Sequence, residues 1–351
     1  MTKWLQEFKS YHTQRSYRTA IRKFKEVLGI ENLERYLENN PDTEGDIRKF
    51  LASLDGSPSK TIACYTQVVK VFFQDQGVKI PDEAWKKIRR RGFMPKRVRA
   101  ETRDKKPTKI MLKKILNYAD LKARAQTLFL VSSGARIGET LQLVKDDFDF
   151  SSDPPRVHIR AEITKGGVGE RTVFFSYEAR DAIQDWLKIK DTLTKRGTSG
   201  DFSGERVFAW NAASARFMWN LACDKAGYGD RDKRTDRRIY HLHSLRKFFR
   251  TKIGLDLDVI HALMGHTEYL DKAYLRLDQD KEIAEAYKEA MANVSVYAVE
   301  DKELKRSVEQ LQDENILLKR QLNGQRPEML KLREELDELR QMLKKIVQQE
   351  D

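Results

Sequence analysis

Cysteine is scarce in this chain, and long apolar runs are absent. Cys64 and Cys223 are the only cysteines among 351 residues, and two so far apart predict neither a disulfide framework nor a zinc site. The first residues lack the apolar run of a secretion signal, and no later stretch approaches the roughly 20 apolar residues that span a bilayer. No cluster of carboxylates suggests a catalytic metal. We therefore expect a cytoplasmic protein that needs no metal or other cofactor.

Positive charge is plentiful, and it is unevenly distributed. The chain has 67 Lys and Arg against 54 Asp and Glu, a net charge of +13. Residues 301–351 hold 11 basic and 12 acidic side chains, so residues 1–300 carry +14. The positive charge of residues 1–300 favours a polyanionic partner such as nucleic acid, and hence association with the nucleoid. A soluble basic protein without such a partner is the alternative.

Residues 1–85 predict a helical domain. Tyr17, Ile21, Phe24 and Leu28 recur at helical spacing and end at a glycine, and a second apolar helix follows a Ser-Pro-Ser start near residue 57. Basic side chains lie between the apolar ones of the first helix, at Arg15, Arg18 and Arg22. That basic side is either a solvated face or a DNA phosphate contact.

Residues 86–107 predict a basic linker. Eleven of the residues 86–106 are basic and two are acidic, with a glycine, a proline and little apolar content. Such a run is often merely solvated, but its charge also suits a strap that wraps DNA. The candidate DNA-binding residues here are Lys86, Lys87, Arg89, Arg90, Arg91, Lys96, Arg97 and Arg99.

Residues 108–300 predict a second domain, mainly helical with a small β-hairpin. Thr108 precedes an apolar helix with Ile110 on its face, and residues 121–131 are an apolar helix. Alternating polar and apolar residues predict the strands, and longer periodic stretches predict two more helices. The strands are expected at 157–163 and 171–175, and the helices at 178–190 and 211–226.

Residues 301–351 predict a coiled-coil tail. One heptad register places mainly apolar residues at both seam positions, with Asn315 at a position that favours a parallel dimer. Gly324 and Pro327 interrupt the middle and predict two helical pieces or one kinked helix. The tail is therefore a candidate for self-association, and packing back on its own domain is the alternative.

A scattered set of polar residues suits phosphodiester chemistry. Arg136 lies in a Gly-Ala-Arg-Ile-Gly-Glu segment, His243 and Arg246 form a His-x-x-Arg pair, and His266 and Tyr274 follow. Residues three apart on a helix share one side. Arginine holds phosphate oxygens with a planar fork that keeps its charge, and fixed cations stabilise a pentavalent phosphorus more than the ground state. A tyrosine nearby can act as the nucleophile.

With these motifs the sequence resembles the tyrosine recombinase (phage-type integrase) family, from residue 1 to about residue 290. The resemblance implies that Arg136, His243, Arg246 and His266 bind the scissile phosphate and that Tyr274 attacks it. It also implies that Glu139 orients Arg136, and that Lys165, in the loop between the two strands, protonates the leaving 5′ oxygen. The coiled-coil tail is not a general feature of the family.

The nucleophile departs from the family pattern. Tyr274 lies eight residues after His266, a shorter spacing than is common, and Asp271 stands where a threonine is usual. Tyr269 is closer still, too close to reach the same phosphate. The shortened spacing is typical of divergent, archaeal or mobile-element members, and it leaves open whether Tyr274 acts in its own subunit or in a neighbour's.

The expected function is site-specific recombination of duplex DNA through a 3′-phosphotyrosyl intermediate, without metal or ATP. Strand exchange on two duplexes requires four subunits, so a tetramer on DNA is expected. One alternative is a non-catalytic DNA-binding or architectural protein on a recombinase scaffold. The other is a type IB-like topoisomerase or a telomere resolvase, which shares the chemistry.

Overall fold

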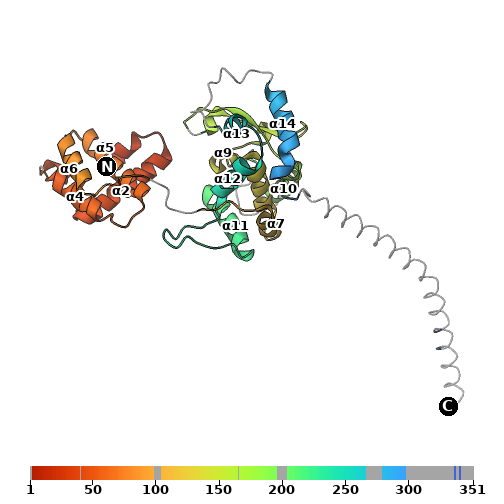
Figure 1. Cartoon of the computed structure of the whole chain (residues 1–351), viewed down its shortest axis with the longest axis horizontal. Helices are drawn as coiled ribbons and strands as arrows, with labels where there is room; N and C mark the ends of the chain where they lie inside the picture. Colours follow the sequence, from red (N-terminus) through yellow and green to blue (C-terminus); the bar gives the residue numbers. More distant parts are fainter. Residues whose placement is uncertain are drawn as a thin grey trace, which may run out of the picture. The chain divides into compact units, whose positions relative to one another are not determined.

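The structure is a computed structural model, and it divides the chain into two compact units (Figure 1). Unit 1 comprises residues 1–105 and 227–241, and unit 2 the remaining described residues. The residues that the structure describes are 2–39, 41–98, 104–164, 166–195, 204–265, 279–297, 336 and 340. Of the predicted coiled coil at 301–351, only Leu336 and Arg340 are among the described residues.

Unit 1 is a bundle of short helices. They are α1 (Thr2–Gln6), α2 (Tyr11–Leu28), α3 (Leu33–Glu38), α4 (Thr43–Ala52), α5 (Ser59–Asp75) and α6 (Asp82–Arg90). The predicted apolar spacing of α2 is confirmed, because Ile21 and Phe24 are fully buried against Phe50 and Phe73. The helix ends where Gly29 adopts a left-handed conformation, with φ of 67°, which glycine tolerates at little cost.

Unit 1 differs from the predicted division of the chain in two places. Helix α6 runs to Arg90, into the predicted linker, because Trp85 and Ile88 pack in the core of the bundle. Residues 227–241, expected inside the second domain, belong to unit 1. There the backbone N–H of Lys105 donates to the carbonyl of Ile239 at 3.2 Å.

Unit 2 is built around helix α8 (Leu121–Ser133). Its described neighbours are α7 (Lys109–Asn117), α10 (Tyr177–Lys195), α11 (Ala212–Lys225), α12 (Leu242–Lys252) and α14 (Gln279–Val294). All residues of α8 from Thr127 to Ser133 are buried, as expected of an apolar helix enclosed on all sides. Thr108 caps α7 as predicted, but Ile110 on that helix is 69% exposed.

The predicted hairpin is part of a three-stranded antiparallel sheet in the order β1-β2-β3. The strands are β1 (Phe148–Asp149), β2 (Arg156–Ile159) and β3 (Arg171–Phe174). Strand β2 ends four residues earlier than predicted, because Ile159 is the last residue paired with β3 and a 3₁₀ turn follows. The predicted fold class, mainly helical with a small sheet, is confirmed for the described residues.

Two further elements frame the candidate site. Helix α9 (Ile137–Thr140) follows α8 after a short break, and α13 (Leu257–Met264) follows α12. Within the described residues, no helix is long and apolar enough to cross a membrane.

Candidate active site

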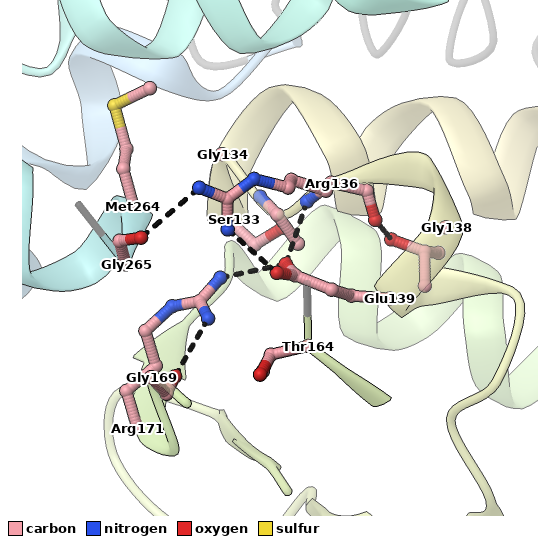
Figure 2. A network of polar contacts seen from close by, with 12 residues as sticks. Ser133, Gly134, Arg136, Gly138, Glu139, Thr164, Gly169, Arg171, Met264 and Gly265 are labelled. Carbon is pink, nitrogen blue, oxygen red and sulfur yellow. Dashed lines mark hydrogen bonds and ion pairs between the residues drawn. The ribbon is translucent and has the colours of Figure 1, made fainter. Parts of the chain in front are cut away.

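Arg136 is held at the start of α9 by Glu139. One Glu139 oxygen accepts from the backbone N–H of Arg136 at 3.0 Å, and the other accepts from its guanidinium at 2.8 Å (Figure 2). The carboxylate thus fixes both ends of the arginine, as a residue at the third position of a helix can. The Glu139 side chain is 2% exposed and that of Arg136 34%, so the cation reaches solvent from a buried anchor.

Arg246 lies on α12, and its buried guanidinium bridges the carboxyl ends of α8 and α13. It is 5% exposed. One nitrogen donates to the carbonyl of Gly134 at 2.5 Å and another to the carbonyl of Met264 at 2.6 Å. Gly134 ends α8 two residues before Arg136, with φ of 64°, and a Cβ there would lie 2.3 Å from the ring of Phe249. Only a glycine lets α8 and α12 approach this closely.

The arginines meet at the carboxyl end of α13. Arg246 binds the carbonyl of Met264, and Arg136 binds that of Gly265 at 3.0 Å. The last carbonyls of a helix lack partners within it and carry partial negative charge, so cations are stabilised there. Two arginines far apart in the sequence are thereby gathered at consecutive carbonyls, immediately before His266.

Arg171 completes the cluster, and the sequence analysis did not select it. Its guanidinium donates to the carbonyl of Leu263 at 2.8 Å. It also donates to the Glu139 carboxylate at 2.7 Å (Figure 2). A Cβ on Gly265 would lie 2.7 Å from this guanidinium. One sequence signal could have indicated it. Side chains two apart in a strand share a face, so Arg171 lies on the same face of the predicted strand as the apolar Val173, which is buried.

Burial and mutual repulsion shape the charges of this arginine cluster, defined as Arg136, Arg171 and Arg246. Burial first, and the nearby charge of Arg136 second, lower the pKa of Arg246 to about 9. Burial also lowers the pKa of Arg171, against the attraction of Glu139. Burial opposes ionisation of Glu139, but the charges and hydrogen bonds of Arg171 and Arg136 outweigh it and lower its pKa. With its pKa at about 9, Arg246 is still cationic near neutral pH.

Of the other predicted catalytic residues, the structure describes only His243. His243 is exposed on α12, three residues before Arg246 and on the same helix side. Lys165, His266 and Tyr274 lie outside the described residues. Lys165 stands in the loop between η2 (Ala161–Ile163) and β3, the strand that carries Arg171.

The predicted DNA-binding residues of unit 1 are exposed where the structure describes them. Arg15, Arg18 and Arg22 lie on the solvent side of α2, opposite its buried apolar residues. The remaining exposed ones, on α6 and after it, are Lys86, Lys87, Arg89, Arg90, Arg91, Lys96 and Arg97. Arg99 lies outside the described residues.

Glu139 makes a testable contribution to stability. Glu139→Ala leaves the guanidinium of Arg171 buried without its ion pair, and we expect a loss of about 3–5 kcal/mol in the free energy of unfolding. Asp185→Ala is the matched control, since its ion pair with Lys188 is 60% and 75% exposed and should contribute less than about 1 kcal/mol. Urea unfolding measures both. Equal losses in the two variants would contradict the role of Glu139.

The ion pairs of Glu139 also predict that the free energy of unfolding falls in acid. The pKa of Glu139 in the fold lies below its ordinary value of 4.5, so the stabilisation is complete above that pH. It is lost as the pH falls through the folded-state pKa. Glu139→Gln should therefore lose less stability than the wild type as the pH falls below 4.5.

Sequence comparisons identify relatives of this chain. Residues 105–279 match the phage integrase family. The chain is 30% identical to tyrosine recombinase XerD of Corynebacterium glutamicum over 157 residues, 44% of this chain and 47% of the relative. It is 27% identical to tyrosine recombinase XerC of the same organism, over 46% of this chain and 48% of the relative. The chain thus spans about half the length of the curated relatives it matches.

Solved structures share the fold. The chain is similar to the Tn1549 transposon integrase in complex with transposon right end DNA, with a TM-score of 0.55 at 16% identity over 81% of this chain and 96% of that one. A lambda integrase dimer bound to a COC′ core site gives 0.51 at 14% identity, over 79% and 99%. With the family match and the two recombinase relatives, these findings show that the chain belongs to the tyrosine recombinase family, the phage integrases.

Proposed function

We propose that this protein is a site-specific recombinase that cuts and rejoins duplex DNA through a 3′-phosphotyrosyl intermediate, without metal or ATP. The observation that carries the proposal is the arginine cluster at the end of α13, with Arg136 and Arg246 on consecutive carbonyls. Fixed guanidinium groups in a largely buried site favour the extra negative charge of a pentavalent phosphorus, at no cost in reorganisation.

The proposed step balances without a cofactor. The phenol oxygen of Tyr274 bonds to phosphorus, the bond from phosphorus to the 5′ oxygen breaks, and Lys165 protonates that oxygen. The phenol proton passes to a base, for which exposed His243 is the candidate. Attack by a partner strand's 5′ hydroxyl reverses these steps, and the phosphotyrosyl bond conserves the energy of the phosphodiester.

Duplex DNA and further copies of this chain are the proposed partners. The two similar solved structures hold DNA, and one of them is a dimer. Exchange between two duplexes requires four protomers, so we propose a tetramer on DNA. The coiled-coil tail is proposed to help gather the protomers, and the basic linker to follow the DNA backbone.

Trapping and mapping of the covalent intermediate tests this function. The full chain is incubated without Mg²⁺ with DNA from the neighbourhood of its own gene, denatured, and digested for peptide mapping. We expect a DNA adduct on the peptide containing Tyr274, at a fixed DNA position with a free 5′ hydroxyl. Binding without any adduct would instead support the non-catalytic alternative. Cleavage at unrelated positions would support the topoisomerase-like one.

A further inference from the structure

A second basic segment, which the catalytic chemistry does not use, lies between α11 and α12. Residues 230–239, called here the basic hairpin, contain five basic and three acidic residues. We propose that this hairpin binds the phosphate backbone of duplex DNA, together with the end of the basic linker. The proposal rests on DNA as the partner of the proposed function, and it adds a contact surface to that function.

The hairpin is held in shape by its own backbone. Arg231 and Arg238 form an isolated antiparallel bridge. The N–H of Asp232 donates to the carbonyl of Arg237 at 2.8 Å, and that of Ile239 to the carbonyl of Asp230 at 3.0 Å. A preformed turn loses little conformational entropy when it binds, so its cations meet a ligand at low cost.

Two of the three acidic side chains of the hairpin, Asp232 and Asp236, are occupied within it. One carboxylate oxygen of Asp232 accepts from the backbone N–H groups of Arg234 and Thr235, at 3.2 and 2.9 Å, and from the Thr235 hydroxyl at 3.0 Å. Asp236 pairs with the guanidinium of Arg231 at 3.2 Å. The aspartates therefore shape the turn, while Lys233, Arg234 and Arg237 are exposed on it.

The base of the hairpin joins the end of the basic linker. Besides the bond from Lys105 to Ile239, His241 lies 3.1 Å from the carboxylate of Asp104. The exposed side chains of Lys105 and Lys106 adjoin this junction in the chain. The positive charge of the linker thus continues into the hairpin, and a single polyanion can contact both.

The composition of the hairpin favours a duplex over other anionic partners. Residues 230–239 contain no aromatic residue, and proteins that hold single strands stack bases on aromatic rings. Ile239 is the one apolar side chain of the segment, too few for an apolar docking site. Arginine and lysine on a fixed turn suit the regular phosphates of a double helix, through charge and forked hydrogen bonds.

The test is the salt dependence of DNA binding by the full chain. Affinity for a labelled duplex of arbitrary sequence is measured by fluorescence anisotropy across salt concentrations. Each phosphate contact contributes about 0.9 to the slope of log affinity against log salt, so Lys233→Gln/Arg237→Gln should lower the slope by about 2. Lys188→Gln/Lys281→Gln removes the same charge from exposed positions on α10 and α14 and should keep the wild-type slope.

A charge-preserving variant separates phosphate binding from damage to the turn. Lys233→Arg/Arg237→Lys should retain the wild-type slope. Equal slopes for the wild type and Lys233→Gln/Arg237→Gln, or a loss confined to single-stranded DNA, would overturn the hairpin proposal. If covalent adducts form nonetheless, the recombinase proposal stands. A lowered slope without adducts on any DNA would support the hairpin and overturn the recombinase proposal instead.

Discussion

Tyr274→Phe is expected to abolish covalent protein–DNA adducts while leaving DNA affinity unchanged. Phenylalanine keeps the ring and removes only the oxygen that would bond to phosphorus. Loss of a nucleophile lowers turnover by several orders of magnitude in other enzymes, so we expect a fall on the order of 10⁴-fold or more. Adduct formation on denaturing gels and anisotropy on the same duplex measure the two quantities.

Tyr269→Phe is the matched control for this prediction. It makes the same chemical change five residues earlier in the chain, and we expect it to keep forming adducts. If adducts persist in Tyr274→Phe and are absent in Tyr269→Phe, Tyr269 is the nucleophile. Neither tyrosine belongs to the described residues, so the chemistry itself has to separate them.

The same variant answers whether the tyrosine acts in its own subunit. Tyr274→Phe protein is mixed with Arg246→Ala protein, neither of which forms adducts by itself. If Tyr274 acts within its own protomer, every site in the mixture lacks one component and no adduct forms. If it acts in a neighbour's site, Arg246→Ala protomers donate their tyrosine to Tyr274→Phe protomers and adducts return.

Local sequence patterns predicted the helix that precedes Arg136 and the shared helix side of His243 and Arg246. The apolar run before Arg136 became α8, and the three-residue spacing of His243 and Arg246 lies on α12 as expected. These predictions succeeded because helical periodicity and a glycine stop are properties of a few neighbouring residues. The expectation that Glu139 orients Arg136 came from the family resemblance, and the two residues are in contact.

Arg171 and the basic hairpin could not be predicted in this way. The importance of Arg171 depends on contacts with Glu139 and Leu263, which are 32 and 92 residues away. No spacing rule connects positions on a strand and on two helices. The same limit applies to the hairpin, because its sequence mixes three acidic residues among five basic ones and does not show which charges are paired. The contacts of Asp232 and Asp236 in the structure show that these two carboxylates stabilise the turn.

Arg246 is expected to dominate the stabilisation of the transition state. Its desolvated guanidinium already has a pKa lowered to about 9 by burial and by Arg136, so an entering phosphate relieves an unfavourable charge in the site. Arg246→Ala should slow adduct formation on the order of 10³-fold or more, the scale at which a fixed arginine acts on a transferring phosphoryl group. Arg246→Lys should recover part of that loss, since it restores a charge without the two-point fork.

A structural defect would produce a different result from a lost phosphate contact. Both Arg246 variants deprive the carbonyls of Gly134 and Met264 of hydrogen bonds, so some loss of thermal stability is expected in each. Inorganic phosphate should raise the melting temperature of the wild type, because a ligand that binds the folded state stabilises it. It should raise that of Arg246→Lys less and that of Arg246→Ala least. Equal protection of all three, with wild-type adduct rates, would remove Arg246 from the phosphate site and leave it as a brace between α8, α12 and α13.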